Sequence, residues 1–103
     1  MIFEWKEYKA ADGAAAAMKD RFMTHTLRFF KRHGIDIVGV YSDPSDPSKL
    51  YYLTRFADDI SRQAAWKAFQ TDPEWQAIKR ETEANGPLLA AQATLVLQPE
   101  NAG

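Results

Sequence analysis

The sequence predicts one α+β domain, in which helices cover one face of a four-stranded antiparallel sheet. Helical patterns separate the first strand from the second and the third strand from the fourth. The resulting order, β-α-β-β-α-(α)-β, is that of the ferredoxin-like split βαβ arrangement. We place this domain at residues 1–99 and expect a flexible tail at 100–103. Four segments have the alternating or apolar pattern of strands, and they lie at 2–8, 35–41, 50–57 and 89–98.

Composition excludes several classes of function. The 103 residues suit one domain, and 13 Lys+Arg against 14 Asp+Glu give a formal net charge of −1. Nucleic acids and anionic membranes require clustered cations, so we expect neither as a partner. The absence of Cys excludes disulfides and thiolate chemistry and is compatible with a reducing compartment. No apolar run approaches the roughly 20 residues that span a bilayer, and charged residues interrupt the first segment, so we expect a cytoplasmic protein.

The first strand and the helix after it carry clear patterns. Phe3 and Trp5 share one face of the strand, and the other face presents Ile2, Glu4, Lys6 and Tyr8. An apolar stripe predicts a continuous helix over 14–33. Asp12 is expected to cap its start, and Gly34 is its stop signal.

The strands at 35–41 and 50–57 form a predicted hairpin, which is closed by an exposed and mobile loop at 42–48. Helices on one side only leave the other face of the sheet bare, and a chain of this length has nothing to cover it. We therefore expect a homodimer through the sheet face, with Phe3 and Trp5 on the covered surface.

Two helices are expected between the third and fourth strands. Asp58 or Asp59 caps the first, at 60–70, and Asp72 with Pro73 begins the second. The first of these helices is expected to bury one set of side chains, namely Ile60, Ala64, Ala65, Ala68 and Phe69.

Three polar side chains of the first strand are candidates for chemistry. Glu4, Lys6 and Tyr8 alternate onto one face, about 6.5–7 Å apart. Facing the helices, this carboxylate, ammonium and phenol would orient an enolizable carbonyl or a phenolate. The alternative is a solvated or salt-bridged strand face.

The two histidines are also candidates. His25 is expected on the inward side of the first helix, between Phe22 and Phe29, as a general base or as a hydrogen-bonded part of the packing. His33 precedes the helix stop and suits a charge–dipole role. They lie roughly 12 Å apart along a helix, so we expect no metal site.

Aromatic residues offer a pocket wall for a flat ligand. The alternative is that they pack the core and the dimer interface. Trp75, near the start of a capped helix, also suits an anchor between helices. The aromatic candidates are Tyr41, Tyr51, Tyr52, Trp66 and Trp75.

Four motifs together resemble the NIPSNAP family. The first is the opening strand Ile-Phe-Glu-Trp-Lys-Glu-Tyr at 2–8, and the second is Phe-Lys-Arg-His-Gly-Ile at 30–35. The third is Tyr-Leu-Thr-Arg-Phe at 52–56, and the fourth is Asp-Pro-Glu-Trp-Gln at 72–76. They occur in the family's order and spacing over nearly the whole chain.

The resemblance implies a dimeric α+β barrel, with a pocket inside each subunit between sheet and helices. Similar folds include antibiotic-biosynthesis and haem-degrading monooxygenases and small cyclases or isomerases. The chain departs from the family pattern with Thr54, where an aromatic residue is common, and from the haem degraders by lacking their His within 75–79. The expected ligand-binding residues are Glu4, Tyr41, Tyr52, Thr54 and Trp75.

These inferences give two functional hypotheses. The first is a small-ligand-binding or scaffold module that uses no cofactor and no metal. The second is a cofactor-independent monooxygenase, cyclase or isomerase acting on a small aromatic or enolizable metabolite. In the second, Lys6 and Tyr8 orient the oxygen and His25 transfers a proton, which requires all three to meet at one enclosed pocket.

Overall fold

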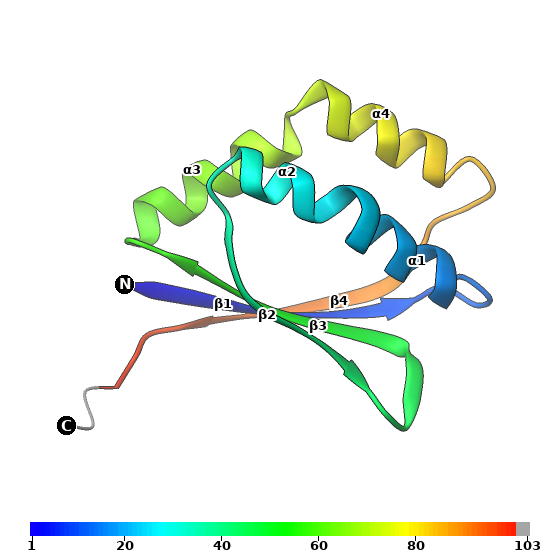
Figure 1. Cartoon of the computed structure of the whole chain (residues 1–103), viewed down its shortest axis with the longest axis horizontal. Helices are drawn as coiled ribbons and strands as arrows, with labels where there is room; N and C mark the ends of the chain where they lie inside the picture. Colours follow the sequence, from blue (N-terminus) through cyan, green and yellow to red (C-terminus); the bar gives the residue numbers. More distant parts are fainter. Residues whose placement is uncertain (101–103) are drawn as a thin grey trace.

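The sheet has four antiparallel strands in the order β2-β3-β1-β4, and the helices form one layer on a single face of it (Figure 1). This computed structural model describes residues 1–100, so most of the tail expected at 100–103 lies outside the described residues. The predicted ferredoxin-like α+β fold is confirmed. The elements are β1 (Ile2–Ala10), α1 (Ala15–Arg21), the π-helix η1 (Phe22–Thr26), α2 (Leu27–Arg32), β2 (Asp36–Asp43), β3 (Asp46–Phe56), α3 (Asp59–Gln70), α4 (Pro73–Thr82) and β4 (Leu89–Leu97).

The register of the central strand β1 decides which side chains face the helices. Lys6 lies opposite Tyr52 of β3 on one side and opposite Thr94 of β4 on the other. Side chains directly opposite each other in an antiparallel pair lie on the same face. The Lys6 face of β1 therefore shares its side of the sheet with Tyr52, and that side is the one the helices cover.

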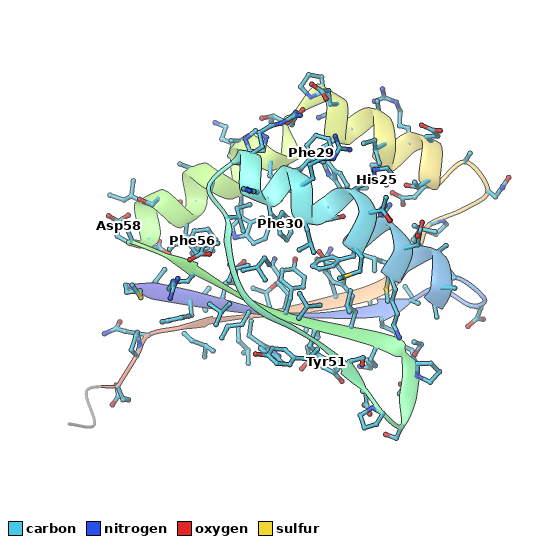
Figure 2. The ribbon with its side chains drawn as sticks, in the orientation of Figure 1. His25, Phe29, Phe30, Tyr51, Phe56 and Asp58 are labelled. Atoms are coloured by element: carbon cyan, nitrogen blue, oxygen red, sulfur yellow. The ribbon has the colours of Figure 1, made fainter. Side chains whose placement is uncertain are left out.

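The core lies between the sheet and the helices and is largely aromatic. Phe30 of α2 points from the helix toward the sheet, whereas Tyr51 of β3 lies on the opposite face (Figure 2). The ring centroids of Phe30 and Tyr52 are 5.6 Å apart, and both side chains are fully buried. Phe22 joins them, 4.9 Å from the Tyr52 ring. Such ring pairs bury large areas at favourable geometry, so they hold the two layers together.

The helix boundaries confirm some of the expected caps. Asp58 accepts a hydrogen bond from the backbone N–H of Ser61, and Asp72 accepts one from that of Glu74. The prediction for Asp12 is wrong, because α1 begins three residues later, with Ala14 at the N-cap and no side-chain cap. Gly34 has φ of 73°, which is the left-handed conformation expected just beyond a helix end.

The hairpin loop is shorter than predicted. β2 continues to Asp43 and β3 starts at Asp46, which leaves only Pro44 and Ser45 between them. The carboxylate of Asp43 accepts hydrogen bonds from both the backbone N–H and the hydroxyl of Ser45. Asp-Pro-Ser therefore forms a compact turn here, because the Asp side chain binds the backbone two residues on.

The inward face predicted for α3 is confirmed for Ala65 and Phe69 but wrong for its other three residues. Ile60 is 82% exposed, and Ala64 and Ala68 are exposed as well. The side chains turned toward the sheet are Arg62, Ala65, Trp66 and Phe69, which share one stripe at helical spacing. Because this stripe includes Arg62, a search for apolar residues at helical spacing does not detect it.

The face of the sheet away from the helices carries a second aromatic cluster. The ring of Trp5 lies 5.7 Å from that of Tyr51 and 5.9 Å from that of Tyr41. Gly39 lets the Tyr41 ring lie close to β2, since a Cβ there would meet the Tyr41 hydroxyl at 2.2 Å. Leu95 of β4, on the same face, is 58% exposed. We call this surface the outer face.

No helix within residues 1–100 is long and apolar enough to cross a membrane.

Candidate functional site: a pocket between the sheet and the helices

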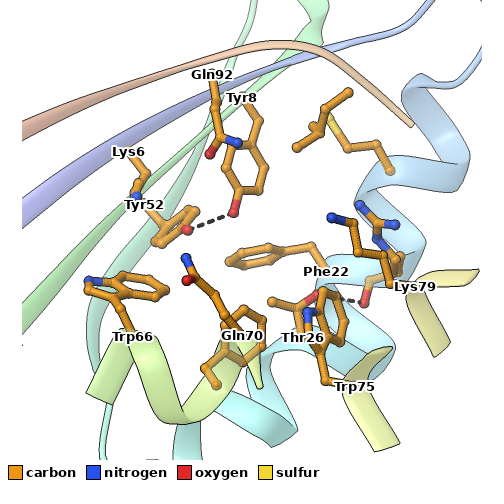
Figure 3. A pocket seen from close by; sticks show the side chains of 14 residues that line it. Lys6, Tyr8, Phe22, Thr26, Tyr52, Trp66, Gln70, Trp75, Lys79 and Gln92 are labelled. Atoms are coloured by element: carbon orange, nitrogen blue, oxygen red, sulfur yellow. Dashed lines mark hydrogen bonds between the residues drawn. The ribbon is translucent and has the colours of Figure 1, made fainter. Parts of the chain in front are cut away.

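A pocket of about 150 Å³ lies between the inner face of the sheet and the helix layer (Figure 3). Five of the candidate residues line it: Lys6, Tyr8, Tyr52, Trp66 and Trp75. Nine further residues complete the lining, namely Met18, Arg21, Phe22, Thr26, Phe69, Gln70, Lys79, Leu89 and Gln92. Within the described chain this lining contains three cations but neither a carboxylate nor an imidazole.

Lys6 is the cation contributed by the sheet. Its ammonium lies 4.7 Å from the centre of the Trp66 ring and 3.5 Å from Oε2 of Glu4. Glu4 is buried, and its other oxygen accepts a hydrogen bond of 2.6 Å from Arg62 of α3. The ion pair with Glu4 is long, and Glu4 Oε2 has no hydrogen-bond partner within residues 1–100, so Lys6 retains N–H groups that can donate to an acceptor in the pocket.

The hydroxyls of Tyr8 and Tyr52 form a hydrogen bond of 2.7 Å inside the pocket (Figure 3). Two hydroxyls carry two hydrogens, and this bond uses one of them. The pair therefore retains one O–H whose hydrogen has no acceptor among the described residues.

Burial keeps both of these phenols protonated. Burial raises the pKa of Tyr8, against the lowering effects of the Tyr52 hydrogen bond and of Arg21. Burial also raises the pKa of Tyr52 well above its ordinary value, and its neighbour Tyr8 adds to the rise. The pair thus acts as a neutral hydrogen-bond donor and not as a phenolate base.

The helices contribute two more cations. Arg21 of α1 is buried, lies 5.6 Å from the centre of the Trp75 ring, and donates to Glu83 at 3.0 Å. Lys79 of α4 lies across the pocket from Lys6, with the Phe22 ring between them (Figure 3). Cations therefore stand at both ends of an aromatic pocket.

A π-helical turn decides which residues of the first helix reach the pocket. The prediction of one continuous helix missed η1, in which the Thr26 hydroxyl donates to the carbonyl of Arg21, five residues back. A π-turn needs more residues per turn than an α-turn, so the residues after it rotate relative to an unbroken helix. Within this turn Thr26 lines the pocket, and His25 does not. The expected inward position of His25 is wrong; its Nδ1 lies 3.4 Å from the Arg28 guanidinium.

Three predicted ligand-binding residues do not line the pocket. Glu4 and Thr54 are buried beside it, where the Thr54 hydroxyl donates to the backbone carbonyl of Glu4 at 3.0 Å and fixes β1 against β3. Tyr41 lies on the outer face, on the other side of the sheet. Strand alternation separates Tyr41 from Tyr52, and only the pairing register reveals this.

Several lining residues escaped the sequence analysis. Arg21 follows Met18 at helical spacing, so a cation on an apolar stripe was the available signal. Gln92 lies opposite Tyr8 across the sheet, which only the register shows. Lys79 belonged to a run of charges that suits a solvated face.

Within residues 1–100, no three His, Cys, Asp or Glu side chains lie close enough together to hold a metal ion.

The protein is therefore a ferredoxin-like α+β domain. Its pocket lies between the sheet and the helix layer and is lined by cations and aromatic rings. The sequence matches the NIPSNAP family over residues 3–101, and the chain belongs to that family. The resemblance of the four motifs is thereby confirmed.

Solved structures support the same fold. An uncharacterized NIPSNAP domain protein from Burkholderia xenovorans has a TM-score of 0.83 at 18% identity, covering 100% of this chain and 98% of its own. A NIPSNAP family protein from Agrobacterium tumefaciens has a TM-score of 0.83 at 16% identity, with coverage of 98% and 94%. SnoaB, a cofactor-independent oxygenase from Streptomyces nogalater, is more distant: its TM-score is 0.65 at 11% identity, with coverage of 98% and 94%. No curated protein matches the chain significantly.

Proposed function

We propose that this protein binds a small, flat organic anion in the pocket between sheet and helices. The observation that carries the proposal is the donor set on the sheet side. The Lys6 ammonium and the spare hydroxyl hydrogen of the Tyr8–Tyr52 pair both serve an acceptor oxygen in the pocket. Glu4 lies beside Lys6 at 3.5 Å but outside the described lining, so the oxygen that would accept from both donors in the pocket is one supplied by a ligand.

Size and wall chemistry narrow the ligand further. A cavity of about 150 Å³ accepts a single benzene-sized ring, whereas pockets for drug-sized molecules run from roughly 300 to 1,000 Å³. Phe22, Trp66 and Trp75 supply aromatic walls. The ligand class that fits is a one-ring or short unsaturated carboxylate, carbonyl or phenol.

Binding is better supported than catalysis. The enzyme hypothesis required Lys6, Tyr8 and His25 to meet at one pocket, and His25 does not line it. The described lining offers no carboxylate or imidazole to take a proton from carbon, and both tyrosines are held protonated. The likeness to SnoaB concerns the fold, at 11% identity.

We extend the proposal to the assembly and its location. The outer face, with Trp5, Tyr51 and Leu95, suits a second copy of the chain as its cover. A formal net charge of −1 raises little repulsion between copies. A cytoplasmic location, expected from the sequence, belongs to the same proposal and is checked by cell fractionation.

Binding is tested by thermal unfolding with benzoate and with benzyl alcohol, which has the same ring and no charge. A ligand present at 100 times its dissociation constant adds about 2.7 kcal/mol to the free energy of unfolding. We expect benzoate to raise the Tm and benzyl alcohol to do so far less. Lys6→Met should remove the difference. The matched control is Lys9→Met, because Lys9 is on the same strand but on the outer face. Equal responses of both variants would exclude Lys6 as the anion partner.

A further inference from the structure

The cations that line the pocket lie at its two opposite ends, and this placement restricts which ligands can pair with all of them. Lys6 stands on the sheet beside Trp66, whereas Lys79 stands on α4 at the opposite end, with the Phe22 ring between them (Figure 3). A ligand with one acidic group can form an ion pair with the lysine at only one of these ends.

The two ends differ in how far their charge is already balanced. At the sheet end, Lys6 lies 3.5 Å from Glu4, whose other oxygen binds Arg62. At the helix end, the guanidinium of Arg21 is paired with Glu83 at 3.0 Å. Lys79, an exposed lysine at the rim of the same pocket, makes no ion pair within residues 1–100. The helix end therefore retains a positive charge without an anion.

The space between the ends is aromatic and narrow. The edges of Phe22 and Tyr52 approach at 4.9 Å between centroids, and Trp75 closes the side beneath Arg21. Flat, unsaturated groups pack well against such rings. The amide of Gln70 also lies among them (Figure 3), so the wall between the two cationic ends is mainly aromatic with a few polar groups.

From this arrangement we propose that the pocket selects a dianion, in which two acidic oxygen groups lie at opposite ends of one flat unsaturated body. One group binds Lys6 and the spare hydroxyl hydrogen of the tyrosine pair. The other binds Lys79, with Arg21 behind it. The inference rests on the proposed binding of an organic anion and adds the number and placement of its charges.

Three benzene carboxylates test the inference by titration calorimetry on the full chain. Benzoate has one acidic group, terephthalate has two at opposite ends of the ring, and phthalate has two on adjacent carbons. Terephthalate is expected to bind about two- to fivefold more tightly than benzoate, since one charge-assisted contact to an exposed lysine contributes roughly that much. Phthalate, with the same charge as terephthalate, is expected to show no such gain.

Variants assign the gain to the helix end. Lys79→Met should lower the affinity for terephthalate to that for benzoate and leave benzoate binding unchanged. Lys67→Met, a change at an exposed lysine of α3 outside the pocket, should alter neither.

Each outcome is decisive. Equal affinities for benzoate and terephthalate, or an equal gain for phthalate, would overturn the dianion inference while leaving anion binding intact. An equal loss of benzoate and terephthalate binding in Lys79→Met would overturn it too. No binding of any of the three acids would overturn the proposed function itself, and the inference with it.

Discussion

The two faces of the sheet differ most sharply on β1, where part of the usual distribution of side chains is reversed. On β1, Glu4, Lys6 and Tyr8 point toward the helices, where polar groups are expensive to bury. The aromatic Phe3 and Trp5 of the same strand point away from the helices, toward the uncovered side. Half-exposed antiparallel sheets normally bury apolar residues and expose polar ones.

The reversal has a different cause on each face. The inner polar groups are held by specific partners, such as Arg62 for Glu4 and Tyr52 for Tyr8, and they open onto a pocket. In the outer aromatic cluster, Trp5 donates a long hydrogen bond of 3.4 Å to Glu7, and nothing within residues 1–100 covers the rings. This difference supports both proposals, a small ligand for the inner face and a second chain for the outer face.

Two adjacent tyrosines of β3 provide the largest expected contrast. Tyr52 is fully buried on the inner face, and Tyr51 lies on the outer face. Tyr52→Ala should lower the free energy of unfolding by about 3–5 kcal/mol, because truncating a buried aromatic side chain leaves a cavity. Tyr51→Ala should cost about 1 kcal/mol in the isolated subunit. Urea unfolding at low protein concentration measures both, and equal costs would break the contrast between the faces.

A charge on the outer face should disrupt the proposed dimer. Leu95→Lys would place two unpaired ammonium groups in a two-fold interface, which is expected to weaken dimerisation by about 3 kcal/mol, or over a hundredfold. Ile60→Lys is the matched control, because Ile60 is 82% exposed but lies on the helix layer. Light scattering at micromolar concentration should give a dimer for the control and a mass near 11.7 kDa for Leu95→Lys. A wild-type monomer under the same conditions would contradict the proposed dimer.

Neighbouring glutamates of β1 provide a contrast in electrostatics. Glu4→Gln removes the charge that pairs with Arg62 and Lys6 in a buried setting, and should cost about 2 kcal/mol of stability. Glu7→Gln, on the outer face, should stay within about 0.5 kcal/mol of the wild type. Chemical unfolding measures both; a neutral Glu4→Gln would show that the charge is not required for the inner face to form.

The smallest effect concerns the helix layer and its pH dependence. The hydrogen bond with His33 lowers the pKa of Asp72 to about 2, assisted by the Glu74 backbone N–H and Arg32 and opposed by burial. An unfolded Asp titrates near 3.9, so the stabilisation is complete above about pH 4 and is lost as the pH falls through about 2.

Unfolding of the wild type and Asp72→Asn at several pH values measures this contribution. Asn retains the N-cap hydrogen bond but lacks the charge. The stability difference between the two proteins should be largest near pH 6 and should shrink toward pH 2. A difference that stays constant over this range would show that the carboxylate charge plays no part.

The local patterns predicted the secondary structure better than the site. Strand alternation in β1 placed Lys6 and Tyr8 on one face, and both line the pocket. Asp58 and Asp72 marked helix starts because a cap depends on a few neighbouring residues. The same reasoning failed for Asp12 and for part of the inward face of α3, where the route of the chain over the sheet decided the outcome.

The sequence by itself determined the order of strands and helices, the family, and the two faces of β1. These follow from short-range periodicity, turn chemistry and motif spacing. Only the tertiary structure decided that His25 does not line the pocket, because the π-turn that contains it leaves no simple composition signal. It alone also brought Lys6, Arg21 and Lys79 to one pocket and moved Tyr41 to the other side of the sheet. Those residues are far apart in the chain, and pairing register and helix packing set which of them meet. The sequence thus predicted which side chains of β1 share a face, but it did not predict which other residues complete the pocket on that face.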